Sequence, residues 1–114
     1  MSIKTTCIGA YPKPDYVPVP DWFSDMTEAV TNEYTQLMQG ASDEIVARLD
    51  KATRQAVLDQ IDCGIDIPTD GEQRRENYVH YQCRHLRGFD FSNLTKRVLR
   101  DGAYETSLPT IRNK

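Results

Sequence analysis

The sequence has 114 residues and a mass of 13.1 kDa, the size of one ordinary domain, and this length excludes a large multidomain protein. Hydrophobic residues make up 39% of the chain, below the usual share of about 45–50%, so the hydrophobic core is expected to be thin. The formal net charge is -3 and basic residues are mixed with acidic ones, which argues against a nucleic-acid partner. No apolar run approaches the roughly 18 residues of a membrane-spanning helix, and the amino terminus is too polar for a secretory signal. We therefore expect a cytoplasmic protein without a membrane partner.

The cysteines and histidines do not form a metal-binding pattern. Cys7, Cys63 and Cys83 are odd in number and have no short paired spacing, which favours free thiols over disulfides. His80 and His85 are five residues apart on a predicted helix, so their side chains lie on different faces. The spacing predicts no metal ligands within this chain.

The first predicted elements are a strand, a loop and two helices. A short strand near residues 3–9 is rich in β-branched residues and ends at a glycine. The next segment, 11–20, contains four prolines and is predicted to be a loop, because proline lacks an N–H group and restricts its neighbour. Helices are predicted near 21–38, with Asp21 as the N-cap, and near 43–63, with Ser42 as the N-cap.

The second half of the chain completes a parallel βαβ pattern. A short strand is predicted at 65–69, and a strand, a helix and a second strand in this order are typical of a parallel α/β sheet. A helix over 72–87 and a strand or hairpin arm over 97–112 follow. The pattern predicts one α/β domain over residues 1–114.

Charged residues follow the second predicted strand directly. Because ligands gather at the carboxyl ends of parallel strands, Asp70 and Glu72 are placed at a candidate binding edge. Arg74 and Arg75 are candidate anion contacts, since guanidinium groups hold substrate carboxylates by paired hydrogen bonds. The alternative is an ordinary Asp-Gly turn followed by a solvated, charged helix start.

A second candidate binding segment is the exit of the first predicted strand at Ile8, Gly9 and Ala10. A glycine at this point lets backbone N–H groups approach a ligand closely, and the two strand ends are neighbours in a parallel sheet. One pocket can therefore use both ends. The alternative is a plain strand exit, and Cys7 within the strand is interpreted as a small core residue.

Three blocks of the sequence resemble the start of the catalytic barrel of cobalamin-independent methionine synthase and its smaller relatives. They are TCIGAYP (6–12), QIDCGIDIPTDGEQRR (60–75) and LRGF (86–89), in matching order and separation, within a resemblance that spans most of residues 3–111. The resemblance implies a (β/α)8 TIM barrel. It also implies the activity of a 5-methyltetrahydropteroyltriglutamate-homocysteine S-methyltransferase, which moves a methyl group from a methylated folate to homocysteine with zinc activating the thiolate.

The resemblance assigns roles to individual residues. Ile8, Gly9 and Ala10 match a strand-exit motif that contacts the amino acid, although family members often have serine where this chain has Ala10. Glu72 matches the glutamate that grips the ammonium group of homocysteine or a methionine-like substrate, and Asp70 is shared with the smaller relatives.

The resemblance covers only the beginning of the barrel. The zinc ligands lie in later strands of the family, so no catalytic or metal-binding residue is assigned within this chain. Tyr104 and Glu105 stand where the synthases carry an Arg-Cys pair that touches the folate, which leaves the methyl-folate donor open.

The length of the chain limits the function that is expected of it. A complete barrel takes about 250 residues, so we expect a methyltransferase fragment that is inactive alone and pairs with the remainder of a barrel or with a second copy of itself. One alternative is a non-catalytic half-barrel interaction module with Trp22, Phe23 and Tyr34 as interface anchors. Another is a related barrel lyase or decarboxylase, because one fold hosts several chemistries.

Overall fold

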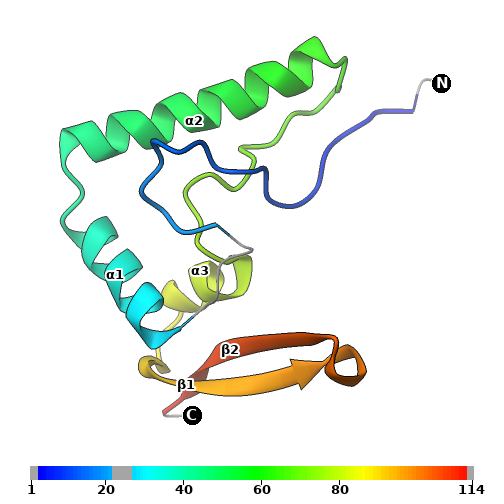
Figure 1. Cartoon of the computed structure of the whole chain (residues 1–114). Helices are drawn as coiled ribbons and strands as arrows, with labels where there is room; N and C mark the ends of the chain where they lie inside the picture. The colour runs from blue at the N-terminus through cyan, green and yellow to red at the C-terminus, as the bar shows by residue number, and fades with distance from the viewer. Residues whose placement is uncertain (1–2, 22–26, 113–114) are drawn as a thin grey trace. The chain divides into compact units, whose positions relative to one another are not determined.

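The computed structural model describes residues 3–21 and 27–112, which fold as two compact units. The first unit comprises Met1–Val19 and Ala41–Arg75, and the second comprises Pro20–Gly40 and Glu76–Lys114. Each unit is therefore assembled from two separate stretches of the chain, as the colours of Figure 1 show. The sequence predicts one domain, whereas the structure has two units. In each unit, two stretches of the chain pack against each other and bury their own set of side chains.

The first unit is built on the long helix α2 (Asp43–Asp62), in the region where a helix near 43–63 is predicted. It begins after Ser42, whose Oγ accepts a hydrogen bond from Ile45 N at 3.4 Å. One face of the helix is buried at helical spacing, and its members are Leu49, Ala52, Ala56 and Gln60.

The two strands predicted at 3–9 and 65–69 meet in a single parallel bridge, between Thr6 and Ile67. Ile67 N donates a hydrogen bond to Thr5 O at 3.0 Å, and Thr6 Oγ1 donates to Ile67 O at 2.6 Å. The bridge joins the two segments side by side, the blue and yellow-green traces of Figure 1, as the βαβ pattern predicts. The prediction of continuous strands is wrong, because the pairing does not extend beyond this bridge.

Local chemistry explains why the parallel pairing stops. Pro68 follows the bridge and has no N–H group to continue a ladder. Before the bridge, Thr5 N donates a hydrogen bond to Asp66 Oδ2 at 2.9 Å. This N–H group therefore pairs with a side chain instead of a backbone carbonyl. This backbone hydrogen bond lowers the pKa of Asp66 below its ordinary value.

The second unit begins with α1 (Glu28–Gln39). Its N-cap is Thr27, whose Oγ1 accepts a hydrogen bond from Val30 N at 3.3 Å, so the prediction of Asp21 as the cap is wrong. The predicted helix near 21–38 therefore starts too early. Five of its residues, 22–26, lie outside the described part of the chain, and they include Trp22, Phe23 and Met26.

The helix predicted over 72–87 is a shorter helix, α3 (Tyr78–Arg84). Asn77 begins it, since its Oδ1 accepts a hydrogen bond from Val79 N at 2.8 Å. The preceding residues form a turn in which Glu72 has a φ of 55°, a left-handed conformation that no α-helix contains.

An antiparallel hairpin ends the second unit. It consists of β1 (Phe89–Leu99), the 3-10 turn η1 (Arg100–Gly102) and β2 (Tyr104–Ile111), shown in orange and red in Figure 1. The register is continuous from the turn back to Leu94 and shifts between Asp90 and Leu94. Residues 91–93 of β1 fall between the pairs Asp90–Thr110 and Leu94–Pro109, so the regular pairing is interrupted there.

The sequence predicts an arm over 97–112 but not β1. Polar residues interrupt the alternation of the missed strand, since Asp90, Ser92 and Asn93 stand near its start. Asp90 is nevertheless buried, because its Oδ1 accepts hydrogen bonds from Ser92 N at 3.0 Å and from Ser92 Oγ at 2.7 Å. These hydrogen bonds, together with Arg112, lower the pKa of Asp90.

Arg84 joins the elements of the second unit. Its guanidinium group donates to Glu76 Oε1 at 2.8 Å and 3.0 Å and, on α1, to Thr35 Oγ1 at 2.5 Å. The rings of Phe91 and Tyr34 lie 4.2 Å and 5.0 Å from the guanidinium carbon. The prediction of Tyr34 as an exposed anchor is therefore wrong, since its side chain is buried against this cation.

The described residues thus form a mixed helix and strand fold with a two-stranded antiparallel sheet. Among them, no helix combines the length and the apolar character that crossing a membrane requires.

Candidate functional site

The candidate site lies in the first unit, where the chain continues past the Thr6–Ile67 bridge. Beyond the bridge, Tyr11 N donates a hydrogen bond to Gly71 O at 2.9 Å. The buried side chain of Gln73 donates from Nε2 to Tyr11 O at 3.5 Å and to Pro12 O at 3.4 Å. These bonds hold the two predicted strand exits together.

The Asp70–Arg75 turn forms a compact charged cluster. Glu72 N donates to Asp70 Oδ1 at 3.0 Å, the hydrogen bond of an Asx turn. Arg75 Nη2 donates to Asp70 Oδ2 at 3.2 Å, and Arg75 Nη1 lies 3.3 Å from Glu72 Oε1. One guanidinium group therefore joins two carboxylates that the sequence places two residues apart.

The burial of these three side chains is graded. Asp70 is 42% exposed, Arg75 is 27% exposed and Glu72 is 19% exposed. Glu72 is thus the most enclosed group of the cluster, while Asp70 faces water. The arrangement offers carboxylate oxygens to a cationic ligand at the joined exits.

Arg74 is directed to a different carboxylate. Its Nη2 forms an ion pair with Asp50 Oδ1 on α2. The structure therefore engages both arginines of the turn with acidic side chains of the chain itself.

The exit of the first predicted strand, residues 8–10, is largely exposed to solvent. Ile8 is fully exposed, Gly9 is exposed with a φ of 89°, and Ala10 is half-buried. The structure joins this segment to the turn through the Tyr11–Gly71 hydrogen bond.

The cysteines remain free thiols in the structure. Cys7 Sγ lies 3.6 Å from Tyr11 Oη, and this interaction raises the pKa of Tyr11. Burial raises the pKa of the Cys83 thiol, which disfavours the nucleophilic thiolate.

The described residues of this chain do not fit a zinc site. Within residues 3–21 and 27–112, no three His, Cys, Asp or Glu side chains lie close enough together to hold a metal ion. The carboxylates of Asp70 and Glu72 are held by Arg75, a cation that competes with a metal for the same oxygens.

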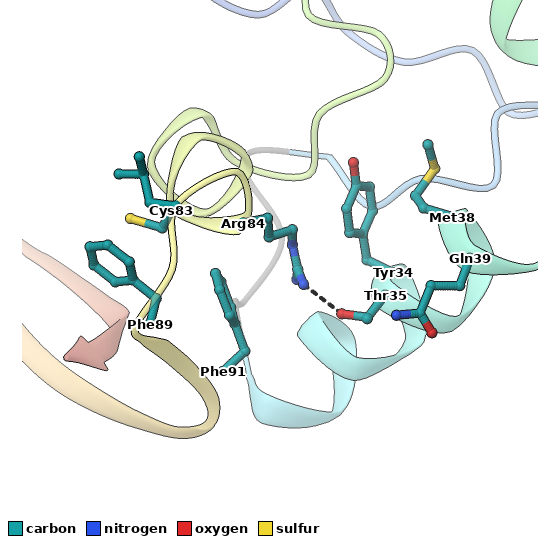
Figure 2. Close-up of a pocket in the computed structure, with 9 residues that line it drawn as sticks. Tyr34, Thr35, Met38, Gln39, Cys83, Arg84, Phe89 and Phe91 are labelled. Carbon is teal, nitrogen blue, oxygen red and sulfur yellow. Dashed lines mark hydrogen bonds between the residues drawn. The ribbon is translucent and has the colours of Figure 1, made fainter. Parts of the chain in front are cut away.

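The structure also contains a pocket that the sequence analysis does not predict. It lies in the second unit between α1, α3 and the start of β1, and its volume is about 350 Å³. Figure 2 shows the side chain of Arg84 reaching Thr35, with the Phe91 ring beside it. Residues distant in sequence line this pocket, so no local periodicity indicates it.

The family model that matches the chain describes the catalytic domain of the cobalamin-independent synthases, and the match covers residues 3–111. The match agrees with the resemblance read from the three sequence blocks.

Similar curated proteins and a solved structure agree with the family model. A methionine synthase of Saccharolobus islandicus is 30% identical over 92 residues, which are 78% of this chain and 24% of that protein. A methionine synthase of Sulfolobus acidocaldarius is 32% identical over 92 residues, 78% of this chain and 23% of that protein. The structure of a B12-independent methionine synthase from Shewanella sp. W3-18-1, in complex with selenomethionine, matches with a TM-score of 0.68 and 30% identity. That match covers 96% of this chain and 29% of the Shewanella chain. The chain thus spans about a quarter of the length of its curated relatives.

Proposed function

The chain belongs to the cobalamin-independent methionine synthase family, and from this membership we propose that its two joined exits form part of the amino-acid pocket of a methyltransferase. The proposed reaction moves a methyl group from a methylated folate-type donor to the thiol of homocysteine or a similar acceptor. Because the chain spans a fraction of its relatives, the reaction is proposed for a complete barrel that includes this segment. We expect the 114-residue chain alone to be inactive.

The observation that carries the proposal is the carboxylate of Glu72 at the place where the two exits meet. It is enclosed on most sides and is held by Arg75 rather than by solvent alone. The Shewanella relative was solved with selenomethionine, an amino acid whose ammonium group is a natural partner for a carboxylate. In this chain, Glu72 is proposed to accept hydrogen bonds from the ammonium group of the ligand.

The other pocket residues have supporting roles in the proposal. Gly9 carries no side chain, so a ligand can approach the backbone between Ile8 and Ala10. Ala10 offers no hydroxyl group, so its contribution is through the backbone. Asp70 holds the turn by accepting the N–H of Glu72.

The surroundings of the pocket are also part of the proposal. The Thr6–Ile67 bridge is proposed to be the first parallel pairing of a (β/α)8 barrel, which the remainder of the barrel would continue. A cytoplasmic location is proposed as well. No step is assigned to zinc, because the described residues do not fit a zinc site.

The test of the proposed function is the binding of L-methionine to the 114-residue chain, followed by NMR titration. Glu72→Gln removes the charge that attracts the ammonium group, so the affinity is expected to fall about tenfold. Glu44→Gln is the matched control, because Glu44 lies on α2 and pairs with Arg48. Equal affinities for wild type and Glu72→Gln would remove the assigned role of Glu72.

A second candidate is a half-barrel interaction module, which the exposed apolar side chains of the first unit favour. Ile8 is 100% exposed and Ile3 is 89% exposed, and Ile67 beside the bridge is also exposed. Side chains of this kind are normally covered by neighbouring strands or by another chain. Under this proposal the chain pairs with a second copy of itself, which a measurement of native mass against concentration would reveal.

A further inference from the structure

We propose that Arg75 is a positioning residue of the amino-acid pocket, which fixes the carboxylates of Asp70 and Glu72 and leaves the pocket with one net negative charge. Such a pocket receives the ammonium group of an amino acid and does not bind the carboxylate of that ligand through Arg75. The inference rests on the proposed function and adds the residue that holds the carboxylate of Glu72 in place for the ligand.

The guanidinium group of Arg75 is paired with two carboxylates. Its Nη2 donates to Asp70 Oδ2 at 3.2 Å, and its Nη1 lies 3.3 Å from Glu72 Oε1. Arg75 is half-buried, so these ion pairs are shielded from water more than a surface pair is. Because two separate nitrogen atoms face two different carboxylates, a ligand carboxylate that took paired hydrogen bonds from Nη1 and Nη2 would compete with both of these ion pairs.

The charges of the turn point to the same ligand group. Two carboxylates and one guanidinium group sum to a single negative charge, and the neighbouring Arg74 is paired with Asp50 on α2. A negative pocket attracts an ammonium group and repels a carboxylate. Without Arg75, the two carboxylates would repel each other and Glu72 would lose its fixed orientation.

The backbone adds a reason why Glu72 needs such a partner. Glu72 has a φ of 55°, a conformation that is unfavourable for a residue with a side chain. The Asx turn to Asp70 and the ion pair with Arg75 hold the residue there from both ends. The same guanidinium group thus stabilises the turn and directs the carboxylate.

The experiment compares two ligands with the 114-residue chain. L-methionine carries both charged groups, whereas 3-(methylthio)propylamine keeps the ammonium group and lacks the carboxylate. If Arg75 positions Glu72, Arg75→Gln weakens both ligands by the same factor, about tenfold, and Arg75→Lys restores part of the affinity for both. Arg48→Gln, which breaks an ion pair on α2, is the control and leaves both affinities unchanged.

Two outcomes of the binding experiment would overturn the inference. If Arg75→Gln weakens L-methionine and leaves 3-(methylthio)propylamine unaffected, Arg75 binds the ligand carboxylate directly. If it weakens neither ligand, Arg75 has no part in the pocket.

A measurement without ligand separates this inference from the proposed function. A double-mutant cycle of Arg75→Gln and Glu72→Gln, followed by urea unfolding, is expected to show coupling of about threefold in the unfolding equilibrium constant. If the wild-type chain binds neither ligand, the proposed function fails, and the coupling still decides the pairing of Arg75 with Glu72. Additive effects of the two substitutions would refute that pairing.

Discussion

Gly71 shows how closely the candidate turn is packed. It is buried and has a φ of 61°, which favours glycine over every residue with a side chain. A Cβ atom at this position would lie 3.0 Å from Ala56 Cβ and 3.1 Å from Tyr11 Cβ. Conformation therefore favours glycine immediately before Glu72, and a side chain here would also push its neighbours by a few tenths of an ångström.

Replacing Gly71 by alanine is expected to lower the free energy of unfolding by about 2–4 kcal/mol, because left-handed strain adds to overlap with two neighbours. Gly64→Ala is the matched control, since Gly64 has a φ of 79° and open space around it. Its expected cost is about 1 kcal/mol from conformation alone. Urea unfolding measures both, and equal losses would show that packing at Gly71 contributes nothing.

At the level of single residues, the sequence indicates which groups gather but not how they pair. The position after a predicted strand is enough to bring Asp70 and Glu72 to the candidate edge. The partners of Arg74 and Arg75 depend on side-chain geometry, and Asp50 lies 24 positions before Arg74. A local pattern contains no signal for a pair of that separation.

Gln60 connects two elements of the first unit. From its buried position on α2, its Nε2 donates to Thr69 O at 2.9 Å and its Oε1 accepts from Thr69 N at 2.9 Å. The same Nε2 also donates to Ala56 O at 2.7 Å. A single amide group thus fixes the segment that leads into the Asp70–Arg75 turn.

Gln60→Leu fills the same space but leaves the N–H and C=O groups of Thr69 without these partners. The free energy of unfolding is expected to fall by about 2–4 kcal/mol, because unpaired backbone groups away from water are costly. Gln55→Leu is the control, since Gln55 is exposed on the same helix and bonds Asp59, and its expected change is within about 0.5 kcal/mol. Thermal unfolding of the two variants tests the difference.

At the level of elements, the accuracy of each predicted helix or strand depended on how many local signals agreed. Ser42, the apolar spacing and Gly64 all point to the helix that the structure places at Asp43–Asp62. The helix predicted from residue 72 begins too early. The charged residues after Gly71 resemble the first turn of a helix, but the N-cap in the structure is Asn77. The strand β1 is missed because the partners of Asp90 come from the folded hairpin and not from the alternation.

The two units are expected to respond differently to acid, because a buried histidine belongs to only one of them. His80 lies on α3, is fully buried, and its Nε2 is 2.8 Å from Ser107 O on β2. Burial lowers the pKa of His80 below its ordinary value of 6.5, and the nearby Arg84 lowers it further. The hydrogen bond with Ser107 O acts in the opposite direction and raises the pKa, but burial outweighs it. Glu76 Oε1 lies 3.8 Å from Nδ1 of the same ring.

The lowered pKa predicts that the second unit loses stability in a pH window that opens near 6.5, the ordinary pKa of histidine in the unfolded chain. Below pH 6.5 the unfolded chain binds a proton at His80 more readily than the folded chain does, so stability falls with pH. Asp66 and Asp90 have pKa values lowered from 3.8, so they titrate below this window.

Hydrogen exchange, expressed as opening free energies, measures this effect separately in α3 and in α2. A larger fall in α3 is expected, and His80→Gln should abolish the difference. His85→Gln, at the exposed histidine, is the control and should keep it. An equal fall in both helices would contradict the assignment to His80.

At the level of the molecule, the sequence predicts the family and the three helices in their order, but not the strand β1 or the division into two units. The family follows from three blocks of residues whose order and separation match. The division arises from packing between stretches that are far apart in sequence, such as Arg84 with Thr31 and Thr35, which no pattern in either stretch indicates.

The interleaving of the two units also sets an order for folding during synthesis. The first stretch of the first unit emerges from the ribosome early, but its partner, Ala41–Arg75, is complete only after Arg75 has been added. The stretch Pro20–Gly40 can form its native contacts only later, since Glu76 and the residues after it complete the second unit. Until then the buried face of α1 has no native partner, so the growing chain depends on late residues to cover early ones.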